Sequence, residues 1–164
     1  MKIKRRMTMF LCLLGMAFGL FGFNSSTALA CSCAPRPTDA ALKYSHAVFS
    51  GKVIKIEYLD DSKQRNPEPR FIVTFKVSRA WKGVNSQEFV LHTIDNSWTC
   101  RGYYFRQDKE YLVFAYQNGA EDAQRFAPHK LPEESFGVSL CGGTKLLKEA
   151  TNDLEVLGEG SVPK

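Results

Sequence analysis

The chain has 164 residues, of which 44% are hydrophobic and 24% are charged, enough for one folded domain and too few for a second large one. Residues 1–30 contain four of the 22 Lys and Arg and none of the 17 acids, so the rest carries 18 basic against 17 acidic residues. This near-neutral balance excludes a basic surface for nucleic acid or an anionic membrane, and 12% aromatic content spread along the chain excludes general disorder.

Residues 1–30 have the organisation of a secretory signal peptide. Lys2–Arg6 form a basic start, Met9–Phe23 are apolar or Gly, and Ala28-Leu29-Ala30 is an A-x-A cleavage site. A membrane-spanning helix would need about 20 apolar residues, and this stretch has 15. We therefore expect a secreted, extracellular protein whose mature domain is residues 31–164.

Cleavage after Ala30 would make Cys31 the first residue of the mature chain. A lipoprotein signal also cleaves before a Cys and then acylates it, which would attach the protein to a membrane. Such signals usually have Leu at the position of Ala28, whereas here Leu29 follows one residue later. We expect an unmodified Cys31 and no membrane association, with lipidation as the alternative.

The mature domain is predicted to be mainly β. Strand-length segments that are apolar or alternate apolar with polar residues lie between stretches rich in Gly, Pro and polar residues. They are 48–56, 71–77, 89–94, 111–116 and 135–140. Gly51 indicates a bulge or bend in the first, Trp81-Lys82-Gly83 ends the second, and Asp60–Pro69 is predicted to be an exposed loop. The run 111–116 is typical of a strand buried on both faces.

Two helices are expected to flank these strands. Thr38-Asp39 can cap a short helix through Tyr44, and Thr144 can cap a longer one that ends at Gly158. We interpret the apolar stripe of the second helix as core packing. The stripe consists of Leu146, Leu147, Ala150, Leu154 and Leu157. Five short strands with one short and one longer peripheral helix predict a five-stranded barrel of the OB type, although composition alone also fits a β-sandwich.

Four cysteines remain after Cys12 is removed with the signal peptide. An even number in an exported chain indicates two disulfides. They are Cys31, Cys33, Cys100 and Cys141. A Cys31–Cys33 bridge would close a very small strained ring, so each of the two should pair with a distant partner, in either order. A metal site is disfavoured, because no His lies at a ligand-like spacing from a Cys pair.

Enzymatic motifs are not found in the sequence. It contains no G-x-S-x-G, no H-E-x-x-H and no Gly-rich phosphate loop. The adjacent acids Asp60-Asp61 and Glu133-Glu134 stand in polar surroundings typical of solvated loops. We therefore expect a protein that is not an enzyme and has no cofactor of its own.

The first residues of the mature domain suggest a different chemistry. Cleavage would leave Cys31-Ser32-Cys33-Ala34-Pro35 at the start of the chain, with a free amine on a disulfide-bonded residue. An α-amine has a pKa of about 7.7 to 8.0, so a useful fraction is unprotonated at neutral pH. The amine nitrogen and carbonyl oxygen of one residue form a five-membered chelate with zinc, and such a chelate could displace the water at a catalytic zinc.

These residues resemble the start of the tissue inhibitors of metalloproteinases. The family's Tyr-Lys-Gly is similar to Trp81-Lys82-Gly83, and its Cys-Gly-Tyr is similar to Cys100-Arg101-Gly102-Tyr103 with one residue inserted. Ala41–Val48 corresponds to the family's first helix and strand entry, and the spacing from Cys31 to Cys100 matches its first disulfide. The resemblance covers nearly all of residues 31–141 and implies a netrin-like barrel of the OB type.

The sequence departs from that family in two ways. One disulfide of the family's inhibitory domain is missing, and Lys43 stands at the position of one of its cysteines. The family's cysteine-rich C-terminal domain is not found either. With these departures the chain resembles a single-domain, bacterial-style member of the family.

The resemblance implies disulfides Cys31–Cys100 and Cys33–Cys141, and a monomeric inhibitor of zinc metalloendopeptidases. The amine and carbonyl of Cys31 would bind the zinc of the protease, and Ser32 would enter a specificity pocket beside it. Further contacts would come from the residues that follow and from a loop next to Cys100. They are Cys33, Ala34 and Pro35, and Ser97, Trp98 and Thr99. The alternative is a secreted netrin-like module that binds another protein without inhibiting it.

Overall fold

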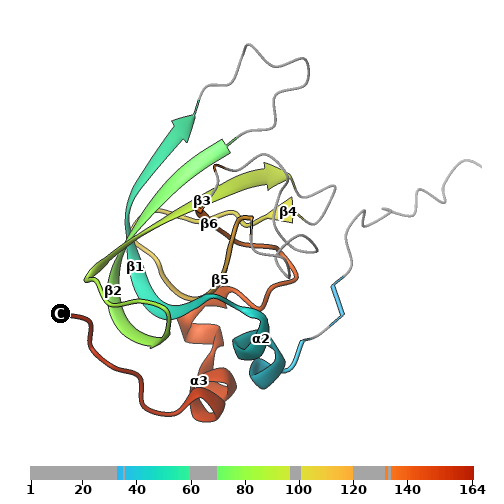
Figure 1. The fold of residues 1–164 in the computed structure, drawn as a ribbon, viewed down its shortest axis with the longest axis vertical. Helices are drawn as coiled ribbons and strands as arrows, with labels where there is room; N and C mark the ends of the chain where they lie inside the picture. The colour runs from blue at the N-terminus through green and yellow to red at the C-terminus, as the bar shows by residue number, and fades with distance from the viewer. Residues whose placement is uncertain (1–32, 35, 60–69, 97–100, 120–131, 133) are drawn as a thin grey trace, which may run out of the picture.

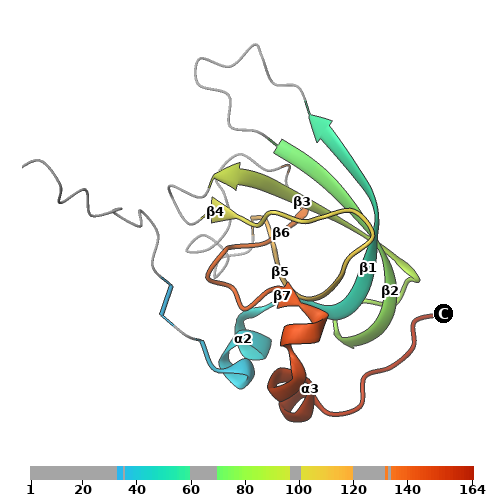
Figure 2. The ribbon, with the colours of Figure 1, turned by 180° about the vertical axis from the view of Figure 1, so that it is seen from behind.

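The computed structural model describes residues 33–34, 36–59, 70–96, 101–119, 132 and 134–164 (Figure 1). In chain order the elements are α2 (Thr38–Tyr44), β1 (Ala47–Leu59), β2 (Arg70–Lys82), β3 (Glu88–Asn96), β4 (Arg101–Gly102), β5 (Glu110–Gln117), β6 (Phe136–Gly137), β7 (Lys145–Leu146), the 3-10 helix η3 (Leu147–Glu149) and α3 (Thr151–Leu157). The two α-helices lie together at one end of a curved sheet, as both views show (Figures 1 and 2).

The sheet closes on itself. Strands β1, β2 and β3 form an antiparallel meander, and β3 then pairs in parallel with β6. Strand β6 pairs antiparallel with β5, and β5 pairs antiparallel with the first half of β1. Because the pairings lead from β1 through β2, β3, β6 and β5 back to β1, the arrangement is a barrel and not a sandwich. The predicted mainly β fold with a five-stranded OB-like barrel is therefore confirmed.

The bulge predicted at Gly51 is confirmed as well. The pairing of β1 with β2 shifts register between Ser50 and Gly51. A Cβ at position 51 would lie 2.8 Å from the carbonyl oxygen of Lys76 on the neighbouring strand, closer than real Cβ atoms come. Glycine thus lets β1 bend sharply enough to reach β2 and β5 together.

Strand β5 is buried on both faces, as its apolar run predicted. Alternate residues along it, such as Tyr111 and Val113, belong to the aromatic-rich cluster inside the barrel. The residues between them, Leu112 and Phe114, belong to an outer cluster with Ala41 of α2 and residues of the C-terminal end. The helices therefore cover the outer face of β5, which explains why period-2 alternation is missing there.

The C-terminal elements differ from the prediction. The prediction of a longer helix from Thr144 is wrong. Lys145–Leu146 form β7, and α3 begins only at Thr151. Like α2, it has seven residues. The hydroxyl of Thr144 accepts the backbone N–H of Phe114 at 3.0 Å and so caps no helix. The end at Gly158 and the packing of the Leu stripe are confirmed. Among the described helices, none is long and apolar enough to cross a membrane.

Two smaller expectations also change. Thr38 does not cap α2, because Pro37 holds the N-cap position and no side chain caps the helix there. The fifth predicted strand, 135–140, is reduced to Phe136–Gly137. In the structure, the Thr38 hydroxyl donates to Asp153 instead of capping the helix, and Phe136–Gly137 pairs with β3 and β5 over one and two residues.

Candidate functional site

The N-terminal segment, of which the structure describes residues 33–34 and 36–37, directly precedes α2. Its first residue, Cys33, forms a disulfide with Cys141, which is 108 positions away in the sequence. This pairing, implied by the family resemblance, is confirmed. Cys33 and Ala34 are both exposed, so the disulfide holds a solvent-facing piece of chain and not a core element.

A second contact holds the segment at Arg36. The Arg36 guanidinium donates a hydrogen bond from Nη1 to the hydroxyl oxygen of Tyr116, at 3.2 Å. Tyr116 is only 1% exposed, and its own hydroxyl faces the carbonyl oxygen of Gly142 at 3.4 Å. Burial raises the pKa of Tyr116, while the Arg36 charge and a hydrogen bond with Ser45 oppose that shift. The phenol therefore stays neutral at physiological pH and can accept from Arg36.

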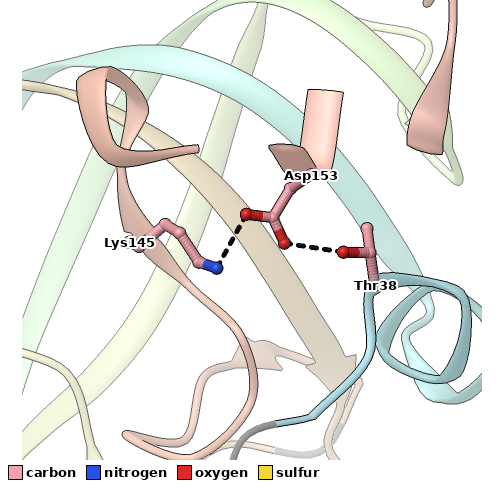
Figure 3. Close-up of polar contacts among 3 residues, drawn as sticks. All are labelled: Thr38, Lys145 and Asp153. Carbon is pink, nitrogen blue, oxygen red and sulfur yellow. Dashed lines mark hydrogen bonds and ion pairs between the residues drawn. The ribbon is translucent and has the colours of Figure 1, made fainter. Parts of the chain in front are cut away.

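A third contact holds the chain where the segment enters α2. The hydroxyl of Thr38 donates to Oδ1 of Asp153 at 2.7 Å, and the ammonium of Lys145 donates to Oδ2 at 2.8 Å (Figure 3). These three residues come from α2, α3 and β7, and Figure 3 shows the carboxylate between its two partners. Three contacts thus hold the chain between Cys33 and Thr38, where Cys33, Ala34 and Pro37 are exposed.

The partner of Cys33 is itself fixed. The backbone N–H of Cys141 donates to the Ser139 hydroxyl at 3.3 Å, and the next N–H, of Gly142, donates to the Ser139 carbonyl at 2.9 Å. Beyond this turn Thr144 is bonded to β5. The disulfide therefore joins the N-terminal segment to a hydrogen-bonded turn.

The second expected contact region follows β3. Strands β3 and β4 form a hairpin in which Asp95 pairs with Gly102 and Asn96 with Arg101. Gly102 has a φ of 70°, and a Cβ there would lie 1.9 Å from the carbonyl oxygen of Ile94, so only glycine fits. Below the hairpin, the hydroxyl of Thr93 accepts the N–H of Tyr103 at 2.9 Å and donates to its carbonyl at 3.0 Å.

Several predicted site residues lie outside the described part of the chain. They are Cys31, Ser32 and Pro35 at the N-terminus, and Ser97, Trp98, Thr99 and Cys100 between β3 and β4. The Cys31–Cys100 disulfide therefore stays a prediction. What the structure does show is that the chain on either side, at Cys33 and at the β3–β4 pair, is anchored.

Hollows in the surface of the described residues include one that is mostly apolar and one that is lined by charges. One, of about 100 Å³, lies at the barrel mouth between β1–β3 and Tyr103–Phe105, and its walls are mostly apolar. The other, of about 550 Å³, is open and lined by mixed charges such as Arg106, Asp108 and Glu110. Within the described ranges, no three His, Cys, Asp or Glu side chains gather in a way that could hold a metal ion.

No protein-family model and no curated protein matches the chain.

Sequence reasoning missed most of the anchoring residues. It named Cys33 and Cys141, but it did not identify Arg36 with Tyr116, or Asp153 with Lys145. The partners in the side-chain hydrogen bonds to the N-terminal region are 80 and 115 positions apart, so no local pattern connects them. The available signal was weak: Arg36 directly follows the Cys-x-Cys-Ala-Pro motif.

Proposed function

We propose that the protein is a secreted inhibitor of zinc metalloendopeptidases, in which the amine and carbonyl of Cys31 chelate the zinc of the protease. The observation that carries this proposal is the Cys33–Cys141 disulfide, which fixes an exposed N-terminal segment on a rigid barrel. The resemblance in Cys31–Pro35 supplies the chemistry, and the OB-like barrel is the fold that the resemblance implies.

A rigid segment suits inhibition for an energetic reason. Binding a protein normally requires ordering of loops and side chains, at about 0.5 to 1.5 kcal/mol for each mobile side chain. The disulfide, the Arg36–Tyr116 bond and the Thr38–Asp153 bond order this region before it meets a partner. Cys33 is two positions after Cys31 in the sequence, and two extended residues span at most about 7 Å, so Cys33 would be close to the proposed zinc ligand.

The remaining residues have subsidiary roles in this proposal. Ser32 enters the pocket next to the zinc, where a small hydroxyl suits broad selectivity. Ala34 and Pro35 continue along the cleft as a substrate would, and Ser97–Thr99 widen the contact from the β3–β4 connection. The zinc belongs to the protease, so the inhibitor requires no metal of its own.

The proposal is tested by changing only the terminal amine. Native protein beginning at Cys31, a form that retains Ala30 and an N-acetylated form should be assayed against a panel of zinc endopeptidases. We expect inhibition by the native form alone, because both changes convert the amine of Cys31 into an amide while leaving the barrel intact. Inhibition should also weaken as pH falls below about 7.7, since a metal ligand must be deprotonated to bind.

The controls are the circular dichroism spectrum and disulfide map of each form, which should be identical. Equally tight inhibition by the Ala-extended form would contradict zinc chelation. In that case a netrin-like module that binds a protein partner through other surfaces would be the better account.

A further inference from the structure

Asp153 occupies an unusual place for a charged residue. It lies in the first turn of α3, is 9% exposed, and uses one carboxylate oxygen for Thr38 and the other for Lys145 (Figure 3). The side chain of Lys145 is 34% exposed, against 12% for Asp153, so the carboxylate is the more buried partner. A buried carboxylate with both oxygens in use is a directional contact, because each oxygen fixes the position of its donor.

The ties of the N-terminal region converge on one part of the chain. Cys33 is bonded to Cys141, and Thr38 to Asp153, both within residues 139–153. Arg36 is bonded to Tyr116, whose hydroxyl in turn faces Gly142. Residues 139–153 therefore hold the N-terminal segment directly at Cys33 and Thr38, and at Arg36 through Tyr116.

The packing of α2 on the barrel does not by itself require this ion pair. Apolar contacts already join α2 to α3 and β5 through Ala41, Ala150 and Phe114, with Leu42 and Leu154 at the edge of the cluster. Such burial is roughly proportional to area and has little directionality. A buried ion pair, by contrast, is weak evidence for stability, because the loss of hydration offsets much of the attraction. The contribution of Asp153 here is to fix the positions of Thr38 and Lys145 relative to α3.

We propose that Asp153 is a positioning residue which, through the hydroxyl of Thr38, sets the direction in which the N-terminal segment leaves the barrel. Thr38 is the first residue of α2, and Pro37 directly before it ends the exposed segment. A rotation at Thr38 would therefore move Ala34 and the residues before it. This inference rests on the proposed function in one respect: the segment so positioned is the one that would bind the protease.

The test compares Thr38→Val, which removes the hydroxyl and keeps the shape, with Thr38→Ser, which keeps the hydroxyl. Thr74→Val on β2 makes the same change away from the segment. The readouts are backbone NMR order parameters at Ala34 and Arg36, the thermal midpoint, and inhibition constants for zinc endopeptidases. None of the three variants alters a cysteine, so the disulfide is kept throughout.

For Thr38→Val we expect the order parameters at Ala34 and Arg36 to fall from about 0.85 toward 0.6, with the β-strands unchanged. Inhibition should weaken roughly threefold to tenfold, because the segment must be ordered again on binding. Thr38→Ser and Thr74→Val should retain native order and inhibition.

Two results would overturn the inference. The first is a Thr38→Val protein with a lower thermal midpoint but native order parameters, which would make the contact merely structural. The second is a Thr38→Ser protein that behaves like Thr38→Val, which would remove the hydroxyl as the cause. A loss of order in Thr38→Val, with no inhibition by any form including the native one, would support the positioning role and contradict the proposed function.

Discussion

The barrel interior and the N-terminal segment are held in opposite ways. Inside the barrel, Phe49, Phe75 and Leu91 are fully buried, and aromatic rings contact one another from strand to strand. In the segment, Cys33 and Ala34 are exposed, and a disulfide and two polar contacts hold the region. The barrel is stabilised by many small contributions, whereas the segment depends on a few specific ones.

This difference indicates which changes should affect folding and which should affect binding. Removing one group from the barrel lowers the free energy of unfolding of the whole domain, because the core unfolds cooperatively. Removing one tie from the segment changes local order while the barrel persists. An exposed segment gains little from burial, so covalent and hydrogen-bonded contacts hold it instead.

The largest effect is expected in the barrel core. Phe75 is fully buried between the rings of Phe49 and Phe105. Phe75→Ala should lower the free energy of unfolding by about 3 to 5 kcal/mol, through lost burial and the cavity left behind. Urea denaturation followed by circular dichroism measures this loss. The smaller change Phe75→Leu should lower the free energy of unfolding by about 1 to 2 kcal/mol. A native midpoint for Phe75→Ala would contradict the assigned core.

The next effect concerns the disulfide. Replacing Cys33 and Cys141 together by Ala should lower the free energy of unfolding by about 2 to 4 kcal/mol, because the bridge spans 108 positions. In contrast to Phe75→Ala, it should also release the segment at temperatures where the barrel is fully folded. Proteolysis near Ala34, measured by mass spectrometry well below the thermal midpoint, distinguishes the two. Equal protection of this segment in the double variant would show that the Cys33–Cys141 bridge is not needed to hold it.

The smallest expected effect is a pH dependence of the free energy of unfolding that comes from one histidine in the barrel wall. His92 on β3 has a buried Nδ1 with no hydrogen-bond partner in the described structure. Burial, together with the nearby charge of Arg70, lowers the pKa of His92 below 6.5. Below pH 6.5 His92 therefore binds a proton more readily in the unfolded chain than in the folded one. The free energy of unfolding should fall as pH decreases below 6.5 and should not depend on His92 above it.

The measurement is the urea midpoint of native protein and His92→Gln between pH 7.5 and 5. The native protein should lose more stability than the variant, with a difference in slope below the single-group ceiling of about 1.4 kcal/mol per pH unit. The ring is only partly buried, so solvent screening reduces the effect. Parallel slopes would show that His92 does not contribute to the acid sensitivity.

Much of the barrel was predictable because its signals are local. The alternation in residues 71–77 and the apolar run 111–116 each identify a strand from neighbouring residues alone. The prediction of the C-terminal helix was wrong because the residue that decides the structure there is distant in the sequence. Thr144 is a good capping residue, but its hydroxyl instead accepts a hydrogen bond from the N–H of Phe114, 30 positions earlier. The following two residues then pair with β5 instead of starting a helix.

The sequence by itself determined the class of fold, because strand periodicity and chain length leave few ways to bury this many apolar residues. It also indicated, through the family resemblance, the pairing of Cys33 with Cys141. Only the tertiary structure decided how the N-terminal segment is supported. The Arg36–Tyr116 and Thr38–Asp153 contacts join residues 80 and 115 positions apart, and which side chains meet at such separations depends on how the barrel closes, not on the residues around each of them.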